Sequence, residues 1–182
     1  MEHYKRVARN LVYNGQVIRV YEDKIEFPDG HTASWDYIEH AGGSAAVAVL
    51  DGKLLMVKQF RNAFDREMLE LPAGGISPGE DPAACAVREL EEETGYHAEE
   101  ASELVTIRTN VALSGEIIRI YLCTGLTKTE RRLDSEENIE VLSLSLSEAL
   151  SLIFKGEISD SKTVAGILTY AALRNNKEYE SH

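Results

Sequence analysis

The sequence predicts an α+β fold in which a mixed β-sheet is flanked by helices and preceded by a β-rich extension. The chain has 182 residues, of which 43% are hydrophobic and 27% charged, so one domain with a sizeable core is expected. Extended, β-branched runs fill most of the first 72 residues and return after residue 103. Helical periodicity is confined to one internal segment and two C-terminal ones. We expect residues 1–40 to form the extension and residues 41–182 the main domain.

The extension reads as two strands joined by a tight turn. "QVIRVYEDKIEF" is rich in β-branched and aromatic residues, "PDG" is a turn signal, and "HTASWDYIEH" is the returning strand. A lone hairpin is marginally stable in water, so we expect these strands to pack on a partner subunit in a C2 homodimer.

The main domain begins with a hairpin. "GGSAAVAVL" and "KLLMVKQF" are joined by Asp51–Gly52, and "MLELP" is a further short strand. After the internal helix, strands are expected at "ELVTIRT", "EIIRIYLCTGL" and "NIEVLSLSL". The segments "SLSEALSLIFKGE" and "SDSKTVAGILTYAALRN" close the chain as two helices.

The internal helix is expected from Pro82 to Thr94. Asp81 can cap it, Pro82 suits its first turn, and Gly95 is a natural stop. Its apolar side chains fall on one arc of the helix and are Ala83, Ala86, Val87, Leu90 and Thr94.

Four glutamates crowd the second half of this helix. Glu89, Glu92 and Glu93 fall within an arc of about 100°, which we expect opposite the apolar arc, whereas Glu91 points elsewhere. Such clusters often form a solvated acidic face. Here, however, the acids lie near the helix C-terminus, where the macrodipole disfavours negative charge, and "LPAGG" precedes the helix. Because carboxylates are hard oxygen ligands, a magnesium site is the alternative interpretation.

The same segment closely resembles the Nudix box of the Nudix hydrolase family. The box reads G-x5-E-x7-R-E-U-x-E-E-x-G-U, where U is a bulky aliphatic residue. Gly74, Glu80 and the run "RELEEETGY" match every fixed position, and only Tyr96, an aromatic, departs from the pattern. The resemblance implies a Nudix α/β/α sandwich that hydrolyses a nucleoside diphosphate linked to another group.

The resemblance also implies roles for single residues. Glu89, Glu92, Glu93 and the carbonyl of Ala73 match metal ligands for Mg²⁺, with Mn²⁺ as an alternative, and Glu92 is also a candidate catalytic residue. Two or more such ions can polarise a phosphoryl oxygen and activate water. Glu80 and Arg88 match positions that brace the motif.

Other stretches resemble the ADP-ribose or ADP-sugar pyrophosphatase branch of the family. These are "VKQFR", "LELPAGG" and "GEISDSKTVAGI", although GDP-mannose hydrolases share the last feature. The resemblance implies that Arg61 and Glu70 contact the substrate, that Glu116 is a general base or further ligand, and that Trp35 stacks on the base. Each role has a simpler alternative. Arg61 could be a surface residue and Glu70 a structural partner of the turn. Glu116 could be an exposed loop acid and Trp35 a packed aromatic residue.

One part of the branch pattern is missing. The stretch aligned with S-P-G-F/G-x-x-E reads "TNVALSGEI", in which Val111 and Ala112 replace the proline and glycine. This departure keeps the chemistry but opens the question of the substrate. ADP-ribose or a related ADP-sugar, cleaved to AMP and a sugar phosphate, is the first hypothesis, and another nucleotide sugar such as GDP-mannose is the second.

Charge and composition limit the remaining classes of function, partner and cellular location. A formal net charge of −12 argues against non-specific nucleic-acid binding. The sequence has no signal-like N-terminus or membrane-length apolar run, and Cys85 and Cys123 lack metal spacing, so we expect a cytoplasmic protein with two reduced core cysteines and no membrane partner. A non-catalytic nucleotide-sugar sensor is the third hypothesis. It is disfavoured because the box glutamates are complete and 182 residues leave little room for a DNA-binding domain.

Overall fold

The computed structural model describes residues 3–133 and 138–176, which fall into two compact units. The first unit contains the chain up to Gly42 together with Arg108–Ile117, and the second contains Gly43–Ile107 and the chain from Ile118 onward.

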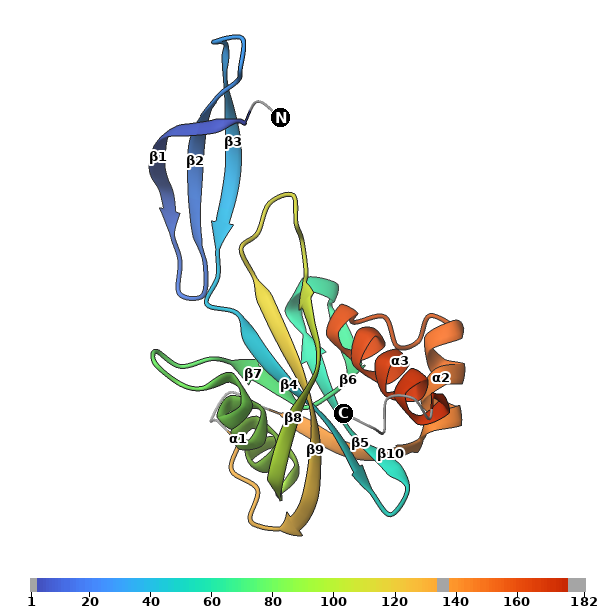
Figure 1. Cartoon of the computed structure of the whole chain (residues 1–182). Helices are drawn as coiled ribbons and strands as arrows, with labels where there is room; N and C mark the ends of the chain where they lie inside the picture. The colour runs from blue at the N-terminus through green and yellow to red at the C-terminus, as the bar shows by residue number, and fades with distance from the viewer. Residues whose placement is uncertain (1–2, 134–137, 177–182) are drawn as a thin grey trace. The chain divides into compact units, whose positions relative to one another are not determined.

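The first unit is a three-stranded antiparallel sheet in the order β1-β2-β3 (Figure 1). The predicted hairpin is confirmed as β2 (Arg19–Glu26) and β3 (Thr32–Glu39), and β1 (Lys5–Asn14) adds a strand that the sequence analysis did not predict. The segment 108–117 is tied to β3, because Ile38 N–H donates to the Leu113 carbonyl at 2.7 Å and Gly115 N–H donates to the Ile38 carbonyl at 3.0 Å.

The second unit is built on a seven-stranded mixed sheet. Its main path runs β10-β5-β4-β9-β8, with β6 paired to β5 and β7 paired to β4. The strands are β4 (Gly43–Leu50), β5 (Lys53–Arg61), β6 (Arg66–Glu70), β7 (Ala73–Gly75), β8 (Tyr96–Arg108), β9 (Ile117–Lys128) and β10 (Ile139–Ser145). The central strand β4 pairs in parallel with β9 and antiparallel with β5 and β7. A 3-10 turn, η1 (Asn62–Phe64), joins β5 to β6.

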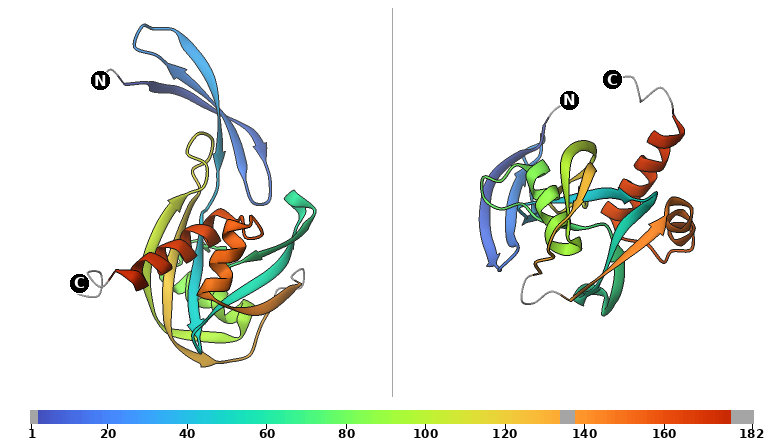
Figure 2. Two further views of the ribbon diagram at one scale, coloured as in Figure 1. Left: turned by 90° about the vertical axis from the view of Figure 1, so that its right-hand side faces the viewer. Right: turned by 90° about the horizontal axis from the view of Figure 1, so that it is seen from below.

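Helices cover both faces of this sheet. Helix α1 (Pro82–Thr94) lies on one face, and α2 (Leu146–Phe154) and α3 (Ser161–Asn175) lie on the other (Figures 1 and 2). Two core clusters follow from the alternation of side chains along β4. Ala46 and Ala48 pack towards α1, whereas Ala45 and Val47 pack towards α2 and α3. The predicted α/β/α sandwich is therefore confirmed.

Close packing of α3 on the sheet depends on a glycine. A Cβ atom at Gly166 would lie 2.7 Å from Leu71 Cδ1 and 3.1 Å from Ile120 Cγ2. The two cysteines are free and buried, as predicted, and burial raises the pKa of each thiol to about 11, so both stay protonated. Among the helices of the described ranges, none is long and apolar enough to cross a membrane.

Candidate active site

Helix α1 begins and ends where the sequence predicts. The Asp81 carboxylate accepts hydrogen bonds from the N–H groups of Ala83 (2.9 Å) and Ala84 (3.1 Å), and Pro82 occupies the first turn. Gly95 ends the helix in the left-handed region at φ 75°, which glycine adopts without steric cost. The loop before the helix is held by Glu80, which accepts from Ser77 N–H at 2.9 Å. These local contacts fix the helix relative to the loop 73–80.

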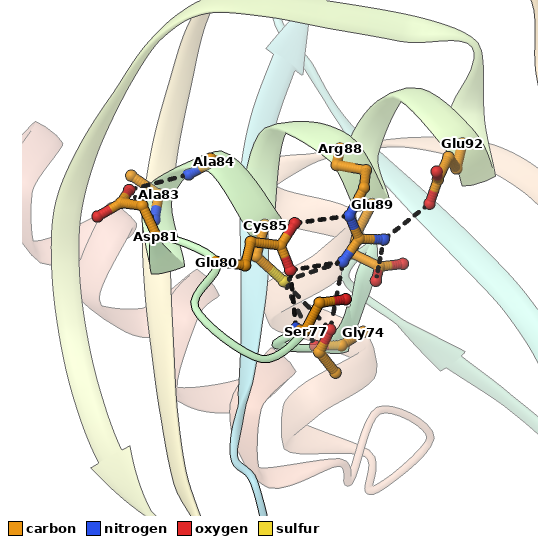
Figure 3. Close-up of polar contacts among 11 residues, drawn as sticks. Gly74, Ser77, Glu80, Asp81, Ala83, Ala84, Cys85, Arg88, Glu89 and Glu92 are labelled. Atoms are coloured by element: carbon orange, nitrogen blue, oxygen red, sulfur yellow. Dashed lines mark hydrogen bonds and ion pairs between the residues drawn. The ribbon is translucent and has the colours of Figure 1, made fainter.

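Arg88 joins the acids of the motif into one network (Figure 3). Its Nε and Nη2 donate to the two oxygens of Glu80 at 2.7 and 3.0 Å. Its Nη1 donates to Glu89 at 2.7 Å and to Glu92 at 2.8 Å. Nη2 also donates to the Gly75 carbonyl at 3.2 Å, which ties the helix back to the loop. Arg88 therefore supplies the positive charge that lets these glutamates lie side by side.

The electrostatics follow from this geometry. Hydrogen bonds from Arg88, with help from the Ser77 N–H, lower the pKa of Glu80 to about 2 against the opposing effect of burial. The hydrogen bond with Glu80 is also the largest influence on Arg88, whose pKa is raised further above its ordinary value. Glu80 is thus a fixed anion, in agreement with the bracing role that the box resemblance implies.

Two of the three predicted ligands are buried, so the expectation that they lie opposite the apolar arc is wrong. The exposed fraction is 2% for Glu93 and 9% for Glu89. The Glu93 carboxylate accepts from Ala73 N–H at 3.0 Å, beside the predicted carbonyl ligand. A Cβ atom at Gly74 would fall 2.1–2.4 Å from the Glu89 carboxylate. The buried face of α1 is therefore rotated towards the loop 73–75, which is shaped to accept these carboxylates.

The donor chemistry of these residues fits a hard divalent cation. The bonded oxygens of Glu89 and Glu92 are 2.7 and 2.8 Å from the same nitrogen of Arg88, so they lie within about 5.5 Å of each other. All the predicted ligand atoms are oxygens, as Mg²⁺ prefers. Within residues 3–133 and 138–176, no three acidic, histidine or cysteine side chains are grouped closely enough to hold an ion as they stand. Because Nη1 of Arg88 binds both Glu89 and Glu92, a cation at these two carboxylates would have to compete with Arg88.

The predicted substrate residues Arg61 and Glu70 bind each other. Arg61 Nε and Nη2 donate to the two Glu70 oxygens, each at 2.6 Å. Glu70 is 2% exposed, whereas the Arg61 side chain is 39% exposed. Both line a pocket of about 770 Å³, together with Phe64, Met68 and residues 159–162. The structure thus places the predicted diphosphate-binding arginine at a cavity wall.

Trp35 and Glu116 belong to the first unit. Trp35 is 46% exposed, and its ring meets those of Tyr4 and Phe27 edge-on at centroid distances of 5.9 and 6.0 Å. Glu116 accepts a short hydrogen bond from Thr109 Oγ1, and His40 Nδ1 lies 3.4 Å from its Oε1. The aromatic ring and the carboxylate are therefore each held by neighbours within their own unit.

The sequence analysis did not predict the residues of α3 and its N-cap that form a hydrogen-bond network with Glu70. Lys162 Nζ donates to Glu70 at 2.5 Å and to Asp160 at 2.9 Å. Asp160 caps α3 by accepting from Thr163 N–H and Oγ1, and Thr163 Oγ1 accepts from Leu71 N–H at 2.9 Å. The helix cap could have been read from "SDSKT", but the contact with Glu70 spans 92 residues of sequence.

Comparisons with known proteins bear on the family to which this chain belongs. The family model of the NUDIX domain matches residues 40–166. The chain is 38% identical to the "ADP-ribose pyrophosphatase" of Bacillus subtilis and 37% identical to the "Methanol dehydrogenase activator" of Bacillus methanolicus, and each alignment covers 90% of both chains. The solved structure titled "Crystal structure of ADP compounds hydrolase" matches with a TM-score of 0.86 at 18% identity, over 96% of both chains. With its box intact in sequence and folded as loop and helix, this chain belongs to the NUDIX domain family and is a Nudix hydrolase.

Proposed function

We propose that this protein hydrolyses the diphosphate bond of ADP-ribose or a related ADP-sugar, with Mg²⁺, to give AMP and a sugar phosphate. The observation that carries the proposal is that one compact unit holds both the box carboxylates on α1 and a cavity lined by Arg61. Relatives named "ADP-ribose pyrophosphatase" also support it, at 38% identity in Bacillus subtilis and 33% in Mycobacterium tuberculosis.

The box residues would hold the metal. Glu89, Glu92, Glu93 and the Ala73 carbonyl supply oxygen ligands, with Mn²⁺ as an alternative to Mg²⁺. When bound, the metal supplies electrostatic stabilisation of the diphosphate oxygens and acidifies water. Arg88 then balances the charge of Glu80, which carries no proposed ligand role.

The remaining chemistry falls to three side chains. Arg61 would hold the diphosphate through its guanidinium, and Trp35 would stack on the base. The Glu116 carboxylate would take a proton from the attacking water, whose oxygen bonds to one phosphorus while the bridging P–O bond breaks. The partners of Glu116, Thr109 and His40, restrict the orientations open to this carboxylate.

The substrate assignment is tested by comparing nucleotide sugars. We expect kcat/KM for ADP-ribose to exceed that for GDP-mannose and ADP-glucose by at least about tenfold, roughly 1.4 kcal/mol in transition-state binding. GDP-mannose is the second candidate because a "GDP-mannose pyrophosphatase" from Citrobacter koseri is 30% identical over 87% of this chain. A smaller preference would remove the ADP-ribose assignment and leave only the Nudix chemistry. Trp35→Ala should raise KM, and an unchanged KM for every substrate would remove the stacking role.

We also propose a cytoplasmic homodimer that binds neither nucleic acid nor membrane. The sheet of the first unit buries few of its own side chains, and its exposed apolar residues include Val7, Leu11, Val12, Tyr13 and Trp35. Such a surface is suited to a second copy of the chain. Light scattering at micromolar concentration should give about twice the monomer mass of 20.2 kDa, and a monomer would refute the dimer.

A further inference from the structure

A largely buried network of charged side chains forms part of the wall of the Arg61 pocket. Glu70 is 2% exposed, Lys162 is 8% exposed and Thr163 is fully buried. Residues 159–162 line the same pocket as Arg61, so the network and the cavity share a wall. Two cations and two carboxylates, those of Arg61, Lys162, Glu70 and Asp160, make up its charge.

The Glu70 carboxylate accepts hydrogen bonds from both Arg61 and Lys162. Arg61 binds it through two hydrogen bonds of 2.6 Å, and Lys162 Nζ donates to Oε2 at 2.5 Å. A buried carboxylate without a compensating cation is strongly unfavourable, so at least one of these partners must always remain. Burial raises the pKa of Glu70, but the Arg61 hydrogen bonds and the Lys162 charge outweigh it, and Glu70 is ionised.

The two cations differ in what else they can reach. The Lys162 side chain is 10% exposed and is held between Glu70 and Asp160, the residue that caps α3. The Arg61 side chain is 39% exposed at the pocket wall. Within residues 3–133 and 138–176, Arg61 donates hydrogen bonds through Nε and Nη2, both to Glu70, and Nη1 has no protein acceptor there. Lys162 is therefore the more buried partner of Glu70, and Arg61 is the more exposed one.

We propose that Lys162 is a positioning residue, whose buried ammonium group neutralises Glu70 so that the Arg61 guanidinium can bind a diphosphate in the pocket. The inference rests on the proposed function in taking the ligand to be a diphosphate. Without Lys162, Arg61 would be the only cation on a buried carboxylate, and its charge would be committed to Glu70. With Lys162, Arg61 can turn towards phosphate oxygens while Glu70 stays compensated.

The test compares Lys162→Met, Lys162→Gln and Lys162→Arg with Lys155→Met, a matched loss of one exposed lysine next to α2. Calorimetry with inorganic pyrophosphate as the probe, in EDTA to exclude metal bridging, measures the anion site without any turnover. Removing the charge in Lys162→Met or Lys162→Gln should weaken pyrophosphate binding at least about tenfold, a typical effect for a charged hydrogen-bonded site. Lys162→Arg should restore binding to within about threefold, and Lys155→Met should match the unsubstituted protein.

Turnover provides a second readout that a merely structural lysine would not move. In the neutral variants KM should rise about tenfold while kcat changes less than about threefold, because uniform binding is lost. Unchanged pyrophosphate affinity in a folded neutral variant would overturn the proposal. So would the absence of pyrophosphate binding to the unsubstituted protein, or the unfolding of both neutral variants, which would make Lys162 a structural residue. If the pyrophosphate pattern holds but no nucleotide sugar is hydrolysed, the proposed function fails and the role of Lys162 stands.

Discussion

Replacing Arg88 by methionine should strongly destabilise the box. Four nitrogen–oxygen contacts of 2.7–3.0 Å join Arg88 to Glu80, Glu89 and Glu92. The Arg88 side chain is 34% exposed, so its ion pairs are intermediate between buried and surface ion pairs. Breaking a buried ion pair costs about 3–5 kcal/mol, whereas a surface ion pair contributes about 0–1 kcal/mol. Since three carboxylates lose their partner together, we expect the free energy of unfolding to fall by about 2–4 kcal/mol.

Urea denaturation at pH 7 and low salt measures this change. Arg174→Met, which removes an exposed arginine from the last turn of α3, is the matched control and should cost less than about 0.5 kcal/mol. Adding Glu80→Gln to Arg88→Met should recover part of the loss, because one unpaired carboxylate is then removed. A loss below about 1 kcal/mol in Arg88→Met would refute the view that Arg88 holds the acids together.

Two further predictions concern the same loop and helix. Gly74→Ala should lower kcat/KM at least about tenfold, because its Cβ would lie 2.1–2.4 Å from the Glu89 carboxylate. Gly75→Ala is the control and should retain activity, because a Cβ there meets nothing within 4 Å. Equal activity in the two variants would contradict the packing of Glu89 on Gly74. For Glu80, the pKa is about 2 in the folded protein and lies above 4 when unfolded, as is usual for glutamate. The stability that Glu80 contributes is therefore fully present above the unfolded pKa and is lost as pH falls towards 2. Urea midpoints between pH 7 and pH 2.5 should fall less steeply for Glu80→Gln than for the unsubstituted protein, and parallel profiles would exclude this contribution.

The part of the site that could be predicted depends on contacts between residues close together in the sequence. Asp81, Pro82 and Gly95 act through contacts within a few residues, so the bounds of α1 could be read from the sequence. The burial of Glu89 and Glu93 could not, because a helical wheel takes no account of the loop 73–75 packed beside them. The roles implied for Glu89, Glu92 and Glu93 as ligands stay predictions.

Long-range contacts and polar strands account for what was missed. Strand β1, "KRVARNLVYN", shows no clear alternation of apolar and polar residues and is exposed almost throughout. It is recognised as a strand only by its pairing with β2. Lys162 has no local pattern that points to Glu70, since their contact depends on how α3 lies against the end of β6. Arg61 and Glu70 were both predicted as substrate residues, but their mutual pairing was not, because the β5–β6 register places Glu70 opposite Val57 and Arg61 opposite Arg66.

The most direct test of the central claim is hydrolysis of ADP-ribose by Glu93→Gln and by the unsubstituted protein, each assayed with Mg²⁺ and with EDTA. Glutamine preserves the size of the buried side chain and can still accept from Ala73 N–H, so the fold should survive. Loss of the carboxylate charge should lower turnover by about 10²–10³-fold, and EDTA should abolish the activity of the unsubstituted protein. Glu91→Gln, on the same helix but paired with His97, is the matched control and should keep its activity. Turnover that persists in EDTA, or in Glu93→Gln at the level of Glu91→Gln, would contradict a metal-dependent reaction at the box.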